Sequence, residues 1–349
     1  MQNLLLIGSF LILLFIANFE VYEAKLKTVK VGNLQLSRIG CGTWSWGNKL
    51  LWGYDESQDD TIKEAYDYVT SQGLNWFDTA DSYGTGALEG QSEKLLGQFS
   101  TDKLSKKNKV YFATKLAPFP WRIGSSSMIN ACSKSSERLN RNVDILQLHW
   151  RPPLGWQETE YLDAFAELAK SQQVTQLGVS NYGPKKLAYV QDYMEEKHGL
   201  SIKSNQVQFS LLSRYPESTG LLDVAKERGI QMIGYSPLAL GLLSDRYNMD
   251  NLPSGPRSFI FKEYLPVIDP LLNELRSIAK YKKKTVPQIA LNWTLQKGAL
   301  ALVGIRSKEQ GVENIKADSF DLSKAEVEAL DIAAKSCKKQ LVQNNFQTD

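Results

Sequence analysis

The feature that most constrains the fold is a repeated alternation of strand-like and helix-like segments after residue 25. Eight short, mostly apolar runs are each followed by a stretch with helical periodicity. The predicted strands are 37–42, 75–79, 110–115, 144–150, 174–180, 204–210, 231–236 and 299–305. The predicted helices lie near 59–72, 92–99, 125–140, 159–171, 184–197, 219–228, 267–281 and 307–317.

Several of these strands, such as VYFAT and DILQL, are apolar along most of their length, which is typical of parallel strands covered by helices. Eight successive βα units predict a closed (β/α)8 barrel, the TIM barrel, rather than an open sheet. An open dinucleotide-binding sheet usually carries a G-x-G-x-x-G turn after its first strand. Neither IGCGTWSWG nor YGTGALEG has that spacing.

Two further segments shape the predicted barrel. LKTVKVGNLQLSRIG predicts an N-terminal β-hairpin that turns at Gly32 and Asn33. The longest irregular stretch, 238–264, follows the seventh strand and predicts a long loop at the end of the barrel where barrel enzymes place their chemistry.

Composition narrows the class of function. The 349 residues carry a net charge of only +3, which is too little to indicate a nucleic-acid partner. The three cysteines, Cys41, Cys132 and Cys337, form no CxxC pair or disulfide framework. His149 and His198 are the only histidines, so the sequence predicts no metal site.

The first 24 residues differ from the rest of the chain. They contain an apolar run at 4–17, which has the length of a signal-peptide core and is short for a membrane span. No Lys or Arg precedes this run and no clean A-x-A site follows it. We expect 1–24 to be a signal peptide or an uncleaved anchor ahead of a barrel at 25–349. The chain would then enter the secretory route or be membrane-anchored, and a plastid reached through that route stays open.

Four polar side chains fall at or just after the ends of three consecutive predicted strands: Asp78, Tyr83, Lys115 and His149. Each has an ordinary explanation when taken alone, as a turn residue, a packing aromatic, a solvated lysine or a hydrogen-bonded core histidine. Because the carboxyl ends of barrel strands share one face, we expect all four to meet in one catalytic site.

These residue types suit proton transfer to or from a carbonyl or alcohol oxygen. A free phenol has a pKa of about 10, and a neighbouring ammonium is expected to lower it. Asp78 would hold Lys115 charged, Tyr83 would exchange the proton, and His149 would orient the substrate oxygen. The set supplies an acid but no reductant, so a cofactor must bring the hydride.

With these residues in place, the chain from about Lys27 to about Ala334 resembles the aldo-keto reductases. The matching motifs are FDTADSYG, ATK, LQLHW, LGVSNY, NQVQFSLL, GYSPLALGLL and VGIRSKEQGVEN, in that order. The pattern is most similar to plant plastid and bacterial-type members. The resemblance implies a (β/α)8 barrel that binds NADP(H), with Asp78, Tyr83, Lys115 and His149 as its catalytic tetrad.

The resemblance also implies cofactor contacts along the barrel mouth. Ser180, Asn181 and Gln206 would bind the nicotinamide carboxamide, with Tyr235 stacked on the ring. Gly42, Thr43 and Trp44 would line the inner end, and Ser236, Leu238 and Gly241 would contact the pyrophosphate. Arg306 and Ser307 would meet the adenosine 2′-phosphate, and Gln310 and Asn314 the adenine end. Gln310 stands where some members carry a second basic residue, so a preference for NADP would rest on Arg306.

The pattern leaves the substrate and one alternative function open. Trp44, Trp46 and Trp150 are expected around the carbonyl pocket, which suits aldehydes and small aromatic or apolar ketones. The favoured function is NADPH-dependent reduction of such carbonyls to alcohols. The alternative is a cofactor-sensing subunit that resembles the β-subunits of potassium channels, which share the tetrad.

Overall fold

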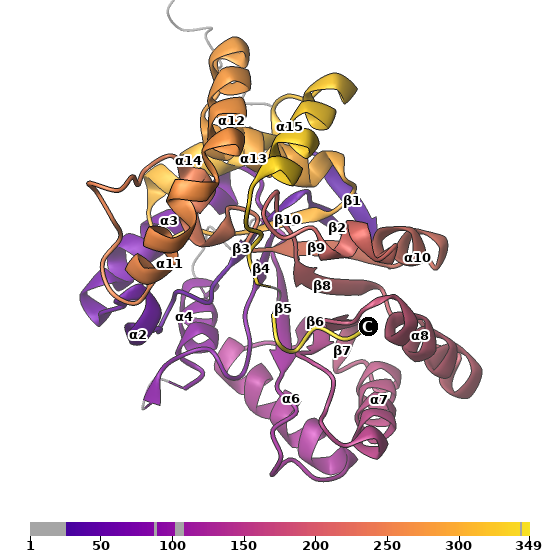
Figure 1. Ribbon diagram of the computed structural model, residues 1–349. Helices are drawn as coiled ribbons and strands as arrows, with labels where there is room; N and C mark the ends of the chain where they lie inside the picture. The colour runs from indigo at the N-terminus through magenta and orange to yellow at the C-terminus, as the bar shows by residue number, and fades with distance from the viewer. Residues whose placement is uncertain (1–25, 87–88, 102–107, 343) are drawn as a thin grey trace, which may run out of the picture.

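The computed structural model describes residues 26–86, 89–101, 108–342 and 344–349, and its centre is a closed barrel of eight parallel strands (Figure 1). The strands run around the barrel in the order β10, β3, β4, β5, β6, β7, β8, β9. They are β3 (Ile39–Gly42), β4 (Trp76–Asp78), β5 (Tyr111–Leu116), β6 (Val143–Leu148), β7 (Val174–Ser180), β8 (Ser204–Gln208), β9 (Gln231–Tyr235) and β10 (Leu300–Gly304). The predicted (β/α)8 barrel is therefore confirmed.

Helices cover the outside of the barrel (Figure 1). Those that match the predicted stretches are α3 (Asp59–Ser71), α4 (Gln91–Phe99), α6 (Ser125–Leu139), α7 (Gly155–Lys170), α8 (Pro184–His198), α10 (Leu221–Glu227), α12 (Asp269–Lys282) and α14 (Lys308–Ile315). Beyond these eight, α13 (Val286–Gln296) and α15 (Lys324–Ser336) add to the outer layer. Both begin with a capping box, at Thr285 and Ser323 respectively.

The predicted N-terminal hairpin is present and fills one end of the barrel. It consists of β1 (Thr28–Val31) and β2 (Leu34–Ser37), paired antiparallel. Val31, Leu34 and Leu36 pack in one apolar cluster with residues that include Trp76 and Tyr111, which begin β4 and β5. Because these belong to the amino ends of the strands, a polar site has room only at the opposite, carboxyl end.

The segment after β9 is more ordered than the sequence predicted. Within 238–264 the chain forms a 3-10 helix, η3 (Ala239–Ser244), and then α11 (Arg257–Tyr264). Leu240 and Gly241 have positive φ angles of 58° and 103° inside η3, which breaks the helical periodicity that sequence patterns detect. The segment packs inward, since Leu242 and Leu243 are buried.

The leader expected at residues 1–24 lies outside the described residues and stays a prediction. Among the helices that the structure does describe, none is both long enough and apolar enough to cross a membrane.

Candidate active site

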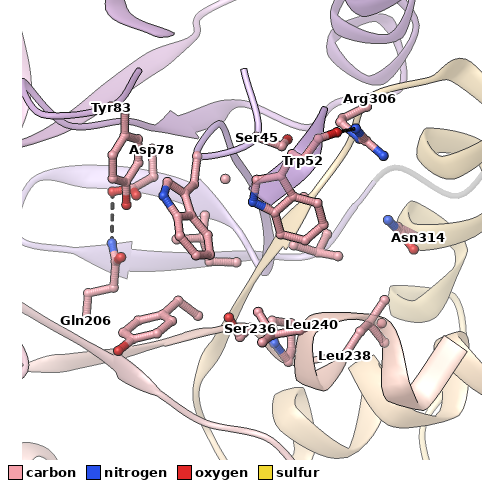
Figure 2. A pocket seen from close by; sticks show the side chains of 18 of the residues that line it. Ser45, Trp52, Asp78, Tyr83, Gln206, Ser236, Leu238, Leu240, Arg306 and Asn314 are labelled. Atoms are coloured by element: carbon pink, nitrogen blue, oxygen red, sulfur yellow. Dashed lines mark hydrogen bonds between the residues drawn. The ribbon is translucent and has the colours of Figure 1, made fainter. Parts of the chain in front are cut away.

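A pocket of about 430 Å³ opens at the carboxyl ends of the barrel strands. Asp78 is the last residue of β4, Lys115 lies next to the end of β5, and His149 directly follows β6. Asp78, Tyr83 and His149 line the pocket, and Lys115 lies buried behind them. Figure 2 shows Tyr83, Asp78 and Gln206 at one end of this pocket and Arg306 and Asn314 at the other. The structure therefore brings the four predicted tetrad residues together.

The tetrad is organised by a buried ion pair between Lys115 and Asp78, each with a side chain only 1% exposed. Lys115 Nζ also donates to the carbonyl oxygen of Thr79 at 2.9 Å and to Tyr83 Oη at 3.2 Å. The second oxygen of Asp78 accepts hydrogen bonds from Gln147 Nε2 at 3.0 Å and Gln206 Nε2 at 2.8 Å. Residues just after β4 and on β6 and β8 thus supply the polar contacts of this buried ion pair.

The charge on Lys115 is secured by this environment. Burial alone would lower the pKa of Lys115, but the charge of Asp78, followed by Tyr83 and the hydrogen bonds to both, raises it above its ordinary value. Lys115 is therefore a permanent cation at neutral pH. This agrees with the role expected for Asp78, which is to keep the lysine charged and in place.

The pKa of Tyr83 differs from the one that the sequence predicted. Burial raises the pKa of Tyr83 above its ordinary value, and Lys115 opposes this effect without reversing it. The sequence correctly predicted that Lys115 lowers the pKa of Tyr83. It did not account for burial, which disfavours the phenolate and raises that pKa by more. Tyr83 consequently stays a protonated phenol at neutral pH, with a cation 3.2 Å away that would stabilise the phenolate left after proton donation.

His149 is neutral in this setting. Burial, together with the charge of Lys115, lowers the pKa of His149 well below its ordinary value. Its ring lies edge-on to Tyr83, with 5.7 Å between the ring centroids. Its Nδ1 atom is buried and has no hydrogen-bond partner among the described residues. His149 lines the pocket, and a neutral imidazole there can donate a ring N–H to a substrate oxygen without adding a second positive charge beside Lys115.

Most of the expected cofactor positions line the same pocket. These are Gly42, Trp44, Ser180, Asn181, Gln206, Tyr235, Ser236, Leu238, Gly241, Arg306, Gln310 and Asn314. Two positions do not. Thr43 is fully buried and its hydroxyl donates to the carbonyl oxygen of Asp78 at 2.9 Å, which ties the ends of β3 and β4 together. Ser307 caps α14 by accepting a hydrogen bond from Gln310 N.

The three tryptophans expected around the substrate separate into two groups. Trp44 and Trp150 line the pocket, whereas Trp46 does not. Trp46 is fully buried, and its indole Nε1 donates to the carbonyl oxygen of Ile305 at 2.9 Å. The prediction that Trp46 contacts substrate is therefore wrong. An indole whose only polar atom is bonded inside the core acts in packing.

The structure adds pocket residues that sequence reasoning missed. Asn344 and Phe346, from the C-terminal tail, line the pocket. Asn344 Nδ2 donates to Tyr235 Oη at 2.8 Å, and Phe346 stacks on Trp150 with centroids 4.3 Å apart. The tail NNFQTD carries no periodicity that could have placed it at the barrel mouth, so only its tertiary contacts reveal it.

The fold and tetrad together define a barrel oxidoreductase, and the chain belongs to the aldo/keto reductase family, which matches residues 38–335. It is 44% identical over 328 residues to a pyridoxal reductase, chloroplastic, from Arabidopsis thaliana, covering 92% of this chain and 89% of the relative. It is 29% identical to an NADH-specific methylglyoxal reductase from Escherichia coli, covering 86% and 96%. A solved aldo-keto reductase from Klebsiella pneumoniae in complex with NADPH is 25% identical with a TM-score of 0.69, covering 91% of this chain and 99% of that one.

We predict that Asp78→Asn lowers the free energy of unfolding at pH 7 by about 3–5 kcal/mol, because it leaves the Lys115 ammonium buried without its carboxylate. In the wild type the raised pKa of Lys115 makes its contribution to stability fully present at pH 7, and that contribution is lost only as the pH rises above the ordinary lysine range. In the variant the pH dependence of stability reverses, because without the Asp78 carboxylate burial lowers the pKa of Lys115. Part of the lost stability should return by pH 10.

Urea unfolding at pH 7 and pH 10 measures both effects. The matched control is Asp192→Asn, which breaks an ion pair with Arg228 at a position where Asp192 is 50% exposed, and which should cost about 0–1 kcal/mol. A loss in Asp78→Asn that is no larger than the control, or that does not vary with pH, would contradict the assigned role of the buried pair.

Proposed function

We propose that this chain is an NADPH-dependent reductase that converts aldehydes or ketones to alcohols, with Tyr83 as the proton donor. The observation that carries the proposal is the hydrogen bond of 3.2 Å from Lys115 Nζ to Tyr83 Oη, in a pocket where Lys115 is paired with Asp78. The protonated Tyr83 phenol can donate its proton, and the Lys115 ammonium beside it would stabilise the phenolate that remains.

We assign a nicotinamide dinucleotide to this pocket from the chemistry of its lining. Side-chain donors and acceptors gather near Asp78, where we assign Ser180, Asn181 and Gln206 to the nicotinamide carboxamide. Tyr235 forms the neighbouring wall, held by its hydroxyl, which donates to Asn181 Oδ1 at 2.9 Å. Ser236, Leu238 and Gly241 would face the pyrophosphate, and Arg306, Gln310 and Asn314 the adenosine half. When bound, the cofactor supplies the hydride.

The residues of the chain perform the rest of the reaction. His149 hydrogen-bonds the carbonyl oxygen and holds it near Tyr83 Oη. Tyr83 donates its proton to that oxygen as negative charge develops on it. Lys115 stabilises the resulting phenolate, and Asp78 keeps Lys115 charged throughout. In the oxidative direction Tyr83 accepts the proton from the alcohol.

We expect Tyr83→Phe to lower kcat by about 10²–10⁴-fold, because it removes the proton donor and little else. NADPH consumption with a panel of aldehydes and ketones measures the rate, and protein fluorescence titration measures the dissociation constant for NADPH. Affinity for NADPH should stay within about threefold, since the hydroxyl is the only group removed.

Turnover by Tyr83→Phe at the wild-type rate would remove Tyr83 from the mechanism. Tight NADPH binding by the wild type with no turnover of any carbonyl would overturn the reductase proposal itself and favour a cofactor-sensing subunit.

For the substrate we infer a planar aromatic aldehyde, with pyridoxal as the first candidate. The 44% identical relative is named as a pyridoxal reductase. The pocket here offers an aromatic wall next to the tetrad, since Trp150 stacks on Phe346 with an interplanar angle of 17° and lies 4.8 Å from the His149 ring. Aromatic side chains of this kind favour flat rings by stacking.

We predict that Phe346→Leu raises KM for pyridoxal by roughly 3–15-fold, because it removes a stacking partner while keeping an apolar side chain. KM for propanal, which has no ring, should change by less than about twofold. Steady-state kinetics with both aldehydes measures the contrast. An equal change for the two aldehydes would contradict a role of the tail in recognising the ring.

We also propose a plastid location, since the 44% identical relative is named as chloroplastic. Residues 1–40 fused ahead of a fluorescent protein should direct it to plastids in leaf cells. Accumulation in the endoplasmic reticulum or outside the cell would contradict this location and favour the signal peptide expected from the sequence.

A further inference from the structure

One buried carboxylate near the active site has no part in the reaction described above. Asp81 lies in residues 79–86, which follow β4 and carry Tyr83, and we call this segment the Tyr83 loop. Asp81 is only 4% exposed, and it does not line the pocket. Any role of Asp81 in the reaction is therefore exerted through other residues.

Both carboxylate oxygens of Asp81 reach a second segment, residues 117–124 after β5, which we call the β5 loop. Oδ1 accepts a hydrogen bond from the backbone N–H of Ala117 at 3.2 Å, and Oδ2 lies 2.5 Å from Arg122 Nη1 in an ion pair. A loop aspartate commonly bonds the backbone about two residues further on, in an Asx turn. The partners of Asp81 lie 36 and 41 positions further on (117 − 81 and 122 − 81), so this side chain connects two separate loops.

Arg122 is itself held in place from two sides. Its Nη1 donates a hydrogen bond to the carbonyl oxygen of Ala117 at 2.6 Å, within the same loop. Its own carbonyl oxygen accepts hydrogen bonds from Tyr161 Oη and from Gln157 Nε2 on α7, the latter at 3.5 Å. The cation that faces Asp81 is therefore anchored to the outer helix layer.

The backbone of the Tyr83 loop adds a third link to the same strand. The N–H of Asp81 donates to the carbonyl oxygen of Lys115 at 3.0 Å, and the N–H of Tyr83 donates to that of Ala80 at 3.1 Å. The contact of 3.2 Å between Lys115 Nζ and Tyr83 Oη joins a strand residue to a loop residue, so it depends on how the loop lies against β5. A displacement of about 1 Å at a reacting group can cost about 10²-fold in rate.

The Asp81 carboxyl titrates close to the physiological range. Burial raises the pKa of Asp81 to about 6, the charge of Arg122 opposes this rise, and the charge of Glu93 on α4 adds to it. Glu93 is itself paired with Arg138. Asp81 is therefore ionised at pH 7, and its ion pair with Arg122 is lost as the pH falls through about 6.

We propose that Asp81 is a positioning residue, which through its ion pair with Arg122 holds the Tyr83 phenol against the Lys115 ammonium for proton transfer. This inference rests on the proposed function and deepens it, because it adds a residue that acts only through Tyr83. Asp78 keeps Lys115 charged, whereas Asp81 fixes the loop that brings the phenol to it.

Single-turnover reduction of propanal by the NADPH-loaded full chain tests this role through the rate and its pH dependence. In the wild type the rate should fall as the pH drops below about 6. Asp81→Asn keeps an acceptor for the N–H of Ala117 but removes the charge, and it should slow the reaction by about 10–100-fold at pH 7. Its rate should no longer fall near pH 6, because the titrating group is gone.

Arg122→Gln and the double variant complete a mutant cycle. Arg122→Gln should slow the reaction to a similar extent and lose the same pH dependence, since it removes the other half of the ion pair. The double variant should be no slower than either single variant, because residues that act as one pair do not contribute independently. Rate losses that multiply in the double variant would contradict the proposal.

Asp318→Asn is the matched control. Asp318 forms an ion pair with Arg38 at 3.2 Å, and these side chains are 1% and 16% exposed, against 2% and 17% for Asp81 and Arg122. Asp318 Oδ2 accepts a hydrogen bond from the N–H of Lys27 at 2.7 Å, which places the pair beside the N-terminal hairpin. The control should keep the wild-type rate and its fall near pH 6.

Hydrogen exchange of the full chain without cofactor, followed by mass spectrometry, reports on the Tyr83 loop without turnover. Asp81→Asn should speed exchange in residues 79–86, and Asp318→Asn should not. Wild-type exchange in Asp81→Asn, a fall in its rate that persists near pH 6, or an equal rate loss in the control would each overturn the proposal. If the wild type turned over no carbonyl, the proposed function would fail, and exchange would still decide whether Asp81 holds the loop.

Discussion

The buried ion pair between Asp78 and Lys115 is the interaction on which the rest of the site depends. A lysine that is 1% exposed can stay charged only if a carboxylate lies against it, and a carboxylate in that position needs donors for its remaining oxygen. Gln147 and Gln206 supply those donors from β6 and β8. One charge pair thus links the carboxyl ends of four strands. Tyr83 lies against the Lys115 ammonium, and His149 lies edge-on to Tyr83.

The two ends of the pocket differ in how their charged side chains are paired. At the tetrad end the single cation is matched by a single anion, and the two other titratable groups stay uncharged, with Tyr83 protonated and His149 neutral. That balance keeps a proton available for transfer. At the other end Arg257 and Arg306 donate to backbone carbonyl oxygens, and among the described residues neither guanidinium pairs with a carboxylate. The two ends of the pocket therefore differ in charge.

Segments from both ends of the described chain complete the barrel. The hairpin fills the amino end of the strands, and the C-terminal tail crosses near the carboxyl end, where the C-terminus is seen beside β7 and α8 (Figure 1). The backbone N–H of Thr348 donates to the carbonyl oxygen of Asn181 at 3.0 Å, and Tyr215 Oη donates to the carbonyl oxygen of Thr348 at 2.7 Å. These contacts hold Phe346 against Trp150. The tail is therefore part of the pocket wall.

The sequence by itself determined the barrel, because eight apolar runs with helical segments between them have few other ways to bury their surfaces. It also predicted the tetrad, since residues that end parallel strands must share a face. It could not show that Trp46 points into the core, that burial outweighs Lys115 in setting the pKa of Tyr83, or that Phe346 reaches the pocket. Nor could it show that Arg257 and Arg306 both lie over the Trp52 ring. Periodicity records which face of its own element a residue occupies, whereas these four facts depend on which distant segments pack together, and only the tertiary structure decides that.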